Sequence, residues 1–146
     1  MRTIDDILKT NGHTLWSVTP DSSVYDAIKQ MADKQVGALP VLNAGKLVGA
    51  ITEKDCIKKV ILKGKSTEET QVWEIMASNS AVTFPAQSVE ECIALMTEKY
   101  IHHLPVISNG SLVGFVSMSD LVRTIIDDQK DYIYRLENYV LGVGFA

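Results

Sequence analysis

The sequence predicts an α/β (α+β) fold in which two copies of a βαββα repeat pack about a pseudo-twofold axis and a long C-terminal helix follows. Three observations support this fold class. The chain aligns with itself at an offset of 65 residues, both copies show the same order of strand-like and helix-like patterns, and an apolar helical stripe continues beyond the second copy. We expect one domain over residues 1–146, with a first repeat at 1–64, a second at 65–128 and a C-terminal helical extension at 129–146.

The internal repeat needs no gap between Trp16 and Lys58. The matched pairs include Pro20 with Pro85, Ser23 with Ser88, Met31 with Met96, Leu39-Pro40-Val41 with Leu104-Pro105-Val106, Leu47-Val48-Gly49 with Leu112-Val113-Gly114, and Asp55 with Asp120. Upstream, residues 4–8 resemble residues 72–76 at an offset of 68, so the first copy carries three extra residues around Asn11–His13.

Each copy is expected to contain the same elements in the same order. These are a short strand (16–18 or 81–83), a helix opened by a capping serine (Ser23 or Ser88), a strand (38–42 or 103–107), a Gly-containing turn, a strand (47–51 or 112–116) and a second helix that begins near Thr52 or Ser117. Strand, helix and strand in succession imply a right-handed crossover between parallel strands. Each copy would then form a three-stranded sheet whose free face packs against the other copy.

The second helix of copy two extends well past the repeat. Its apolar stripe comprises Val122, Ile125, Ile126, Gln129, Ile133, Leu136 and Val140, with Tyr132 and Tyr139 beside it and Gly142 as the expected stop. A helix of this length outruns a small domain. The stripe either packs back on its own chain or meets a partner, and from its length we expect a homodimer.

Composition narrows the functional classes. The formal net charge of −4 argues against broad binding to nucleic acid. No apolar run approaches the ~20 residues of a membrane span, and the N-terminal residues lack the apolar core of a signal peptide. Two cysteines without a CxxC pairing indicate reduced thiols, so we expect a cytoplasmic protein without membrane attachment.

The doubled Leu-Pro-Val strand and the doubled Gly-x-x-[Thr/Ser]-x-x-Asp motif (Gly49–Asp55 and Gly114–Asp120) resemble tandem cystathionine β-synthase (CBS) domains, over nearly the whole chain. The tail also looks like that of small stand-alone bacterial CBS-pair proteins. This resemblance implies a regulatory module that binds AMP, ADP, ATP, NAD or S-adenosylmethionine between the repeats and signals to an effector protein.

The same residues suit a nucleotide chemically. Thr52 and Ser117 stand where a strand ends and a helix begins, and a helix N-terminus offers free amides to a phosphate. Asp55 and Asp120 lie one helical turn further on, where a carboxylate can accept hydrogen bonds from ribose hydroxyls. Both pairs are also ordinary helix-capping patterns, so spacing alone leaves capping and ribose binding open.

The resemblance implies two ligand sites, each built from both repeats. The first would combine Thr52 and Asp55 with Val82, Thr83, Ile101, His102 and His103; the second would combine Ser117 and Asp120 with Ser17, Val18, Val36, Gly37 and Ala38. We expect the first site to bind a phosphorylated ligand better, because it would bring the two histidines to the phosphates. On this expectation Asp55→Asn reduces affinity more than Asp120→Asn.

Other activities find little support in the sequence. Adjacent His102 and His103 point to opposite faces of a strand and lack a third ligand at a usual spacing, which disfavours a metal site. Cys92 aligns with Ala27 on a helix face and is expected to be a buried, inert thiol. No catalytic set is visible, so we expect no enzyme and no catalytic cofactor. The main alternative to nucleotide sensing is a ligand-free dimerisation or protein-interaction module.

Overall fold

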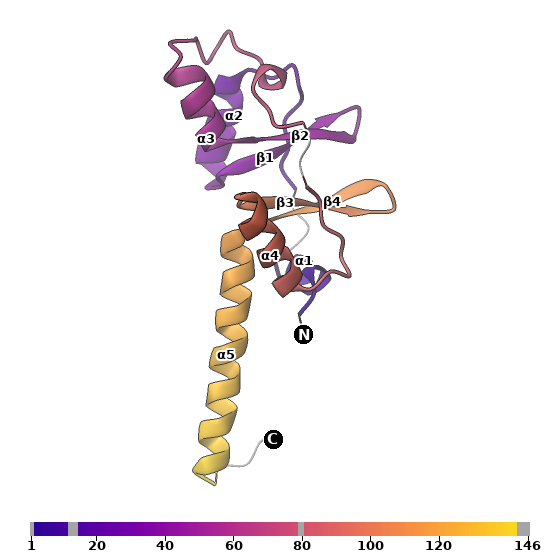
Figure 1. Cartoon of the computed structure of the whole chain (residues 1–146), viewed down its shortest axis with the longest axis vertical. Coiled ribbons are helices and arrows are strands. Elements are labelled where there is room, and N and C mark those ends of the chain that lie inside the picture. The colour runs from indigo at the N-terminus through magenta and orange to yellow at the C-terminus, as the bar shows by residue number, and fades with distance from the viewer. Residues whose placement is uncertain (1, 12–14, 79–80, 143–146) are drawn as a thin grey trace.

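The computed structural model describes residues 2–11, 15–78 and 81–142. It shows two similar lobes stacked along one axis and a long helix that extends beyond them (Figure 1). The first lobe contains α2 (Val24–Lys34), β1 (Ala38–Asn43), β2 (Lys46–Thr52) and α3 (Glu53–Cys56), which continues into a π-helical turn (Ile57–Ile61). The second lobe contains α4 (Val89–Lys99), β3 (His103–Ser108), β4 (Ser111–Ser117) and α5 (Met118–Val140). The predicted fold class and the long C-terminal helix are thereby confirmed.

The first helix of each copy begins as predicted. The hydroxyls of Ser23 and Ser88 accept hydrogen bonds from backbone amides three residues on, each at 3.0 Å. Both helices end at a residue with left-handed backbone, Gln35 (φ 57°) and Tyr100 (φ 56°), whose N–H bonds back to the last turn. The matching caps show that the sequence repeat is also a repeat of local structure.

The predicted third strand of each sheet shrinks to a single parallel bridge. β1 pairs with β2, and β3 with β4, as antiparallel hairpins, whereas Val18 bridges Val41 and Thr83 bridges Val106. In the first lobe the amides of Val18 and Leu42 donate to Pro40 and Val18. The next bond in either direction would need an N–H from Pro40 or Pro20, and proline has none. Pro105 and Pro85 end the bridge of the second lobe in the same way.

Each lobe takes its leading helical segment from the other copy. α1 (Ile4–Asn11) contributes Ile4 and Ile7 to the core of the second lobe, while Val72 and Ile75, in and beside a 3-10 turn (Val72–Glu74), belong to the core of the first lobe. The expected boundary between residues 64 and 65 therefore separates the two sequence copies, but it does not separate the two hydrophobic cores. Gly12 and His13, which belong to the predicted insertion, lie outside the described residues.

Both glycines of the doubled motif lie where these segments cross. A Cβ on Gly49 would stand 2.6 Å from the carbonyl oxygen of Ala77, and one on Gly114 would overlap the side chain of Leu8. Close packing of the leading segments on the strands therefore explains glycine at both positions.

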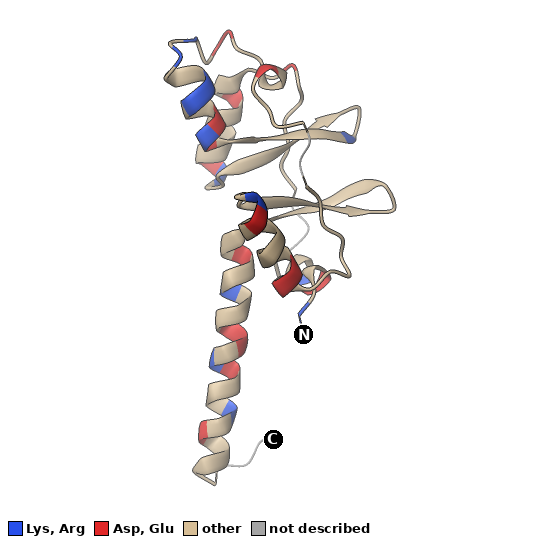
Figure 2. Cartoon of the chain, viewed as in Figure 1, with Lys and Arg blue, Asp and Glu red and all other residues tan. Residues whose placement is uncertain are grey.

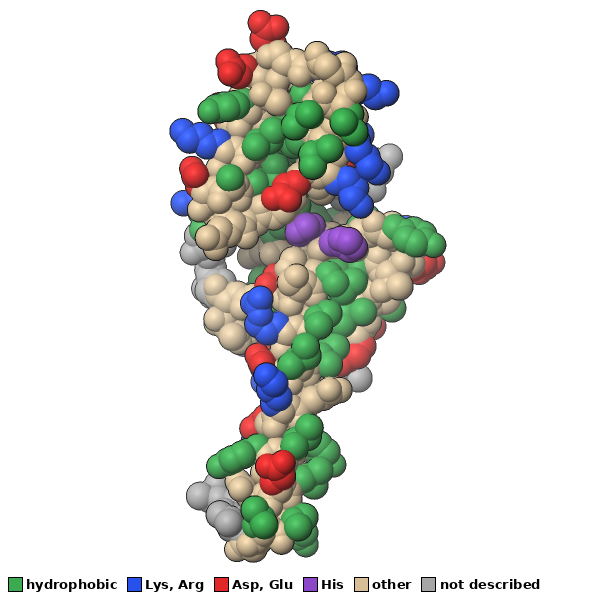
Figure 3. Space-filling model, turned by 90° about the vertical axis from the view of Figure 1, so that its left-hand side faces the viewer, with side chains coloured by type: hydrophobic (Ala, Val, Ile, Leu, Met, Phe, Trp, Pro, Cys, Tyr) green, Lys and Arg blue, Asp and Glu red, His purple; other side chains and the backbone are tan. Residues whose placement is uncertain are grey.

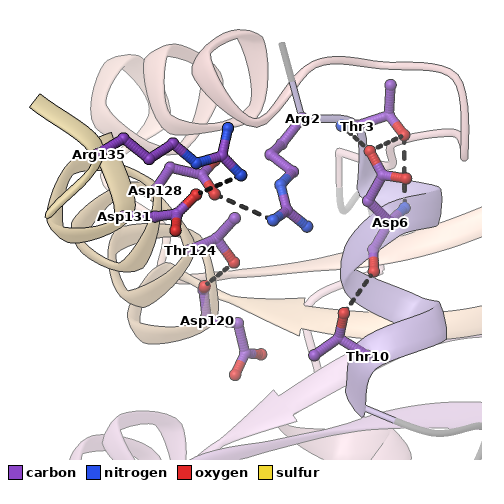
Figure 4. Close-up of polar contacts among 9 residues, drawn as sticks. All are labelled: Arg2, Thr3, Asp6, Thr10, Asp120, Thr124, Asp128, Asp131 and Arg135. Carbon is purple, nitrogen blue, oxygen red and sulfur yellow. Dashed lines mark hydrogen bonds and ion pairs between the residues drawn. The ribbon is translucent and has the colours of Figure 1, made fainter. Parts of the chain in front are cut away.

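Only the beginning of α5 packs on the second lobe. Leu121 is fully buried, and Ile125 is the last α5 residue that packs against a hydrophobic core. Arg2 forms an ion pair with Asp128, with 3.0 Å between the guanidinium nitrogen and the carboxylate oxygen, and Asp131 pairs with Arg135 on the same helix (Figure 4). Gly142 follows the last turn with φ 72°, in line with the predicted stop, whereas Val143 and Gly144 lie outside the described residues. Within the described ranges no helix combines the length and hydropathy needed to cross a membrane.

Candidate functional site

A cavity of about 1000 Å³ opens between the two lobes. Its walls come from the start of β1, the end of β4, the first two turns of α5, the loop before β3 and the segment around Trp16. The predicted site residues that line it are Val36, Gly37, Ala38, His102, His103, Ser117 and Asp120. A cleft of this size and position between repeats is a common form of small-molecule site.

Ser117 and Asp120 form a complete capping box at the start of α5. The Ser117 hydroxyl accepts from the amide of Asp120 at 3.1 Å, and the Asp120 carboxylate accepts from the amide of Ser117 at 2.9 Å through Oδ2. Among the described residues, no donor is recorded for the second oxygen, Oδ1. Asp120 can therefore cap the helix with one oxygen and still accept from a ligand with the other, so the two roles that the sequence left open are compatible.

The two histidines lie at the waist between the lobes (Figure 3). The His103 ring stacks on Phe115 with centroids 5.7 Å apart, and its Cε1 stands 3.7 Å from the place of a Cβ on Gly37. Burial, helped by the neighbouring charge of His102, lowers the pKa of His103, and Asp120 acts in the opposite direction. In the ligand-free protein His103 is therefore biased toward its neutral form, and an anion beside it would reverse that bias.

The equivalent position in the first lobe is arranged differently. Thr52 caps α3 by accepting from the amide of Asp55 at 3.0 Å, but the Asp55 carboxylate pairs with Lys59 at 3.4 Å. Lys59 Nζ also donates to the carbonyl of Ile75 at 3.0 Å. Asp55 is thus already neutralised by a cation that the packing fixes, and neither Thr52 nor Asp55 lines the cavity.

The structure distributes the predicted site residues in a way that the sequence did not anticipate. His102 and His103 join Ser117 and Asp120, whereas the following do not line the cavity: Ser17, Val18, Thr52, Asp55, Val82, Thr83 and Ile101. Val18 and Thr83 are buried in the parallel bridges, and the Thr83 hydroxyl lies 3.0 Å from Cys92 Sγ. The preference for the Asp55 site remains an untested prediction, but the histidines that motivated it line the cavity of Ser117 and Asp120.

Among the further wall residues that sequence reasoning did not name as site residues are Arg123 and Trp16. Arg123 stands three residues after Asp120 and thus on the same face of α5. The repeat aligns it with Lys58, so a paired basic position in the repeat was the available signal. Trp16 lies under Lys34, whose Nζ is 5.3 Å from the centre of the ring.

Both cysteines are buried and free, as expected for Cys92. Burial raises the pKa of the Cys56 thiol to about 11, so its thiolate is scarce at neutral pH. In residues 2–11, 15–78 and 81–142 no group of three His, Cys, Asp or Glu side chains is placed to hold a metal ion.

Two segments, residues 3–62 and 72–127, match the family described as CBS domain. The chain is 38% identical over 150 residues to the mitochondrial CBS domain-containing protein CBSX3 of Arabidopsis thaliana, covering 96% of this chain and 72% of that protein. It is 31% identical to CBS domain-containing protein YhcV of Bacillus subtilis, covering 83% and 84% of the two chains.

The solved structures lead to the same family. A candidate signal-transduction protein with CBS domains from Burkholderia ambifaria superposes with a TM-score of 0.84 at 44% identity, covering 88% of this chain and 96% of that one. The hexameric CBS-CP12 protein from bloom-forming cyanobacteria superposes with a TM-score of 0.74 at 28% identity, covering 83% and 70%. Since the matched segments span both repeats, the chain belongs to the CBS domain family and carries two CBS domains in tandem.

Proposed function

We propose that this CBS pair is a regulatory module that binds an adenine nucleotide, AMP, ATP or NAD, in the cavity bordered by Ser117 and Asp120. The nucleotide is bound without turnover, and its presence is transmitted to an effector protein. CBS domains commonly bind adenine nucleotides and are typically non-catalytic regulatory modules. The single observation that carries the proposal is the inter-lobe cavity, because its wall presents an acceptor for ribose next to basic side chains for phosphate.

Asp120 is the proposed ribose anchor. Its Oδ2 is fixed by the Ser117 amide, which holds the carboxylate in place before any ligand arrives. Its Oδ1 can then accept from a ribose hydroxyl, a hydrogen bond strengthened by the charge of the acceptor. Preorganisation of this kind reduces the entropy lost on binding.

The phosphates are proposed to lie against His102, His103 and Arg123, which line the same cavity. A guanidinium binds a phosphate through paired N–H donors, and a protonated imidazole adds a second cation. Val36, just before β1, and Ala38, its first residue, supply an apolar surface for the base. A cavity of about 1000 Å³ has room for a mononucleotide or for a longer ligand such as NAD.

A ligand-free interaction module is the second candidate, and one observation favours it. The capping box at Ser117 and Asp120 is complete without a ligand, so it explains both residues by itself. This reading needs only the exposed part of α5 for function. For either candidate we propose the cytoplasm as the location, since two buried free thiols suit a reducing compartment.

Calorimetric titration of the purified chain with AMP, ATP, NAD and S-adenosylmethionine tests the proposal. We expect saturable binding of at least one adenine nucleotide, with the nucleotide recovered unchanged after incubation. The same ligand should raise the melting temperature by mass action. No heat and no thermal shift with any of the four would favour the interaction module, and hydrolysis would contradict a non-catalytic role.

A further inference from the structure

The exposed face of α5 has the spacing of a coiled-coil seam. Val122, Ile126, Gln129, Ile133, Leu136 and Val140, hereafter the α5 seam, follow one another at intervals of four and three residues. This alternation keeps one narrow stripe facing a partner helix over almost three heptads. The apolar members of the seam are between 41% and 79% exposed, so the described part of the chain leaves the stripe uncovered.

The ionic contacts of α5 lie away from this seam. Asp128, which pairs with Arg2, and the Asp131–Arg135 pair occupy heptad positions on the far side of the helix (Figure 4). Acidic and basic residues follow one another along the outer part of α5 (Figure 2). The helix is therefore amphipathic in the part that leaves the lobe, where no hydrophobic core formed by the described residues reaches it.

The two flanks of the seam differ in character. One flank, the charged flank, consists of Arg123, Lys130 and Glu137; the other, the apolar flank, consists of Ile125, Tyr132 and Tyr139. In a parallel pair of identical helices, the charged flank of each helix would face the apolar flank of the other. In an antiparallel pair, like flanks meet, so charges face charges and tyrosines face apolar side chains. Such flanking pairs select the orientation of a coiled coil.

We propose that α5 binds a second copy of this chain as an antiparallel two-stranded coiled coil. In this register Ile126 packs against Leu136 of the second copy, and Val122 against Val140 of the second copy. The same register places Arg123 beside Glu137 of the second copy, twice per dimer by symmetry. The overlap of residues 122–140 is about 28 Å long at 1.5 Å per residue, which leaves the two globular parts at opposite ends.

Two features of this arrangement limit its affinity. Gln129 faces Ile133 of the second copy, and the two Lys130 side chains approach each other near the twofold axis. A polar residue in a seam costs stability but fixes register and partner number. We therefore expect a dissociation constant on the order of micromolar and not nanomolar.

Cysteine cross-linking on chains with different tags tests the orientation. One chain carries Ile126→Cys and the other Leu136→Cys, and no nucleotide is added. We expect a short bismaleimide to join the two chains when they are mixed and to join neither chain to itself. Self-linking of each chain alone would overturn the proposal, because it indicates a parallel pair. Native Cys56 and Cys92 are at most 1% exposed, and Asp131→Cys on the outer face is the matched control.

A charge exchange tests the same register on an intact seam. Glu137→Arg brings two arginines together and should weaken the dimer about tenfold in sedimentation equilibrium, and adding Arg123→Glu should restore it. Asp127→Arg alters the net charge equally on the outer face and should change little. A monomeric mass for the unmodified chain at about 50 µM would overturn the proposal. The same holds if adding Arg123→Glu fails to restore the dimer. Since no nucleotide is present, these outcomes are independent of the proposed ligand.

Discussion

Replacing Asp120 by asparagine separates ribose binding from helix capping. The asparagine carbonyl can still accept from the Ser117 amide, now 2.9 Å from Oδ2, so the helix cap is largely retained. The other carboxylate oxygen becomes an NH2 group, which cannot accept from a ribose hydroxyl. A hydrogen bond to a charged group contributes about 1.5–3 kcal/mol, so affinity for AMP should fall about 10- to 100-fold. The free energy of unfolding should fall by about 1 kcal/mol or less.

Asp55→Asn is the informative comparison. Asp55 faces Lys59 at 3.4 Å, and the Lys59 side chain is half exposed, so this pair contributes about 1 kcal/mol or less to stability. Because Asp55 lies outside the cavity, its replacement should change AMP affinity by less than about threefold. This order of effects is the reverse of what the sequence alone led us to expect.

Calorimetry at pH 7.5 measures the affinities, and thermal unfolding of the same samples measures stability. Asp127→Asn, on the same helix but outside the cavity wall, removes the same charge and serves as control. If Asp120→Asn lowers stability and leaves affinity unchanged, Asp120 is a cap only and the proposed site is refuted. If Asp55→Asn has the larger effect on affinity, the nucleotide binds on the other side of the pseudo-twofold axis.

Three further predictions follow from particular contacts. Burial lowers the pKa of His103, so an anionic ligand that raises this pKa again must bind more tightly as pH falls from about 7.5 to 6. The protein without ligand should lose stability below about pH 6.5, because the unfolded chain then binds a proton that the folded chain does not. Calorimetry and thermal unfolding of His103→Ala should show both pH dependences flattened. Gly114→Ala should destabilise the fold by about 1–3 kcal/mol in urea unfolding, because its Cβ meets Leu8; an unchanged midpoint would contradict the packing. Ile4→Ala should cost about 2–5 kcal/mol and reduce hydrogen-exchange protection in α4 and β3 before α2 and β1, since Ile4 belongs to the second lobe.

The internal repeat made the order of elements predictable, because capping serines, apolar periodicity and turn glycines act locally. Local chemistry also limits each sheet to two full strands, because prolines prevent the third from pairing further. Pro20 and Pro40 each lack the N–H that would extend the Val18 bridge, but this becomes visible only once the register of the bridge is known. The packing of α1 on the second lobe depends on contacts of residues 4–7 with residues 89–121, and no local sequence pattern predicts contacts between segments so far apart.

The sequence predicted the residue types of the candidate site, but it did not predict which of these residues share one cavity. Ser117 and Asp120 were named from the motif and residues 36–38 from the family resemblance, and all five line one cavity. The family resemblance grouped the histidines with Thr52 and Asp55, because the direction of a side chain cannot be read from the motif. The stacking of His103 on Phe115 sets that direction, and it depends on the register of β3 with β4.

The nucleotide site and the coiled coil, if both form, share one side chain. Arg123 lines the cavity one turn after Asp120 and also belongs to the charged flank of the α5 seam. A phosphate in the cavity and Glu137 of a second copy would therefore compete for the same guanidinium. Exposed ion pairs contribute about 0.2–1 kcal/mol each, so losing two per dimer weakens association about two- to thirtyfold. Linkage is reciprocal, so dimerisation must weaken nucleotide binding by the same total factor. If both proposals hold, a modest charge competition at the start of one helix converts nucleotide occupancy into a change of assembly.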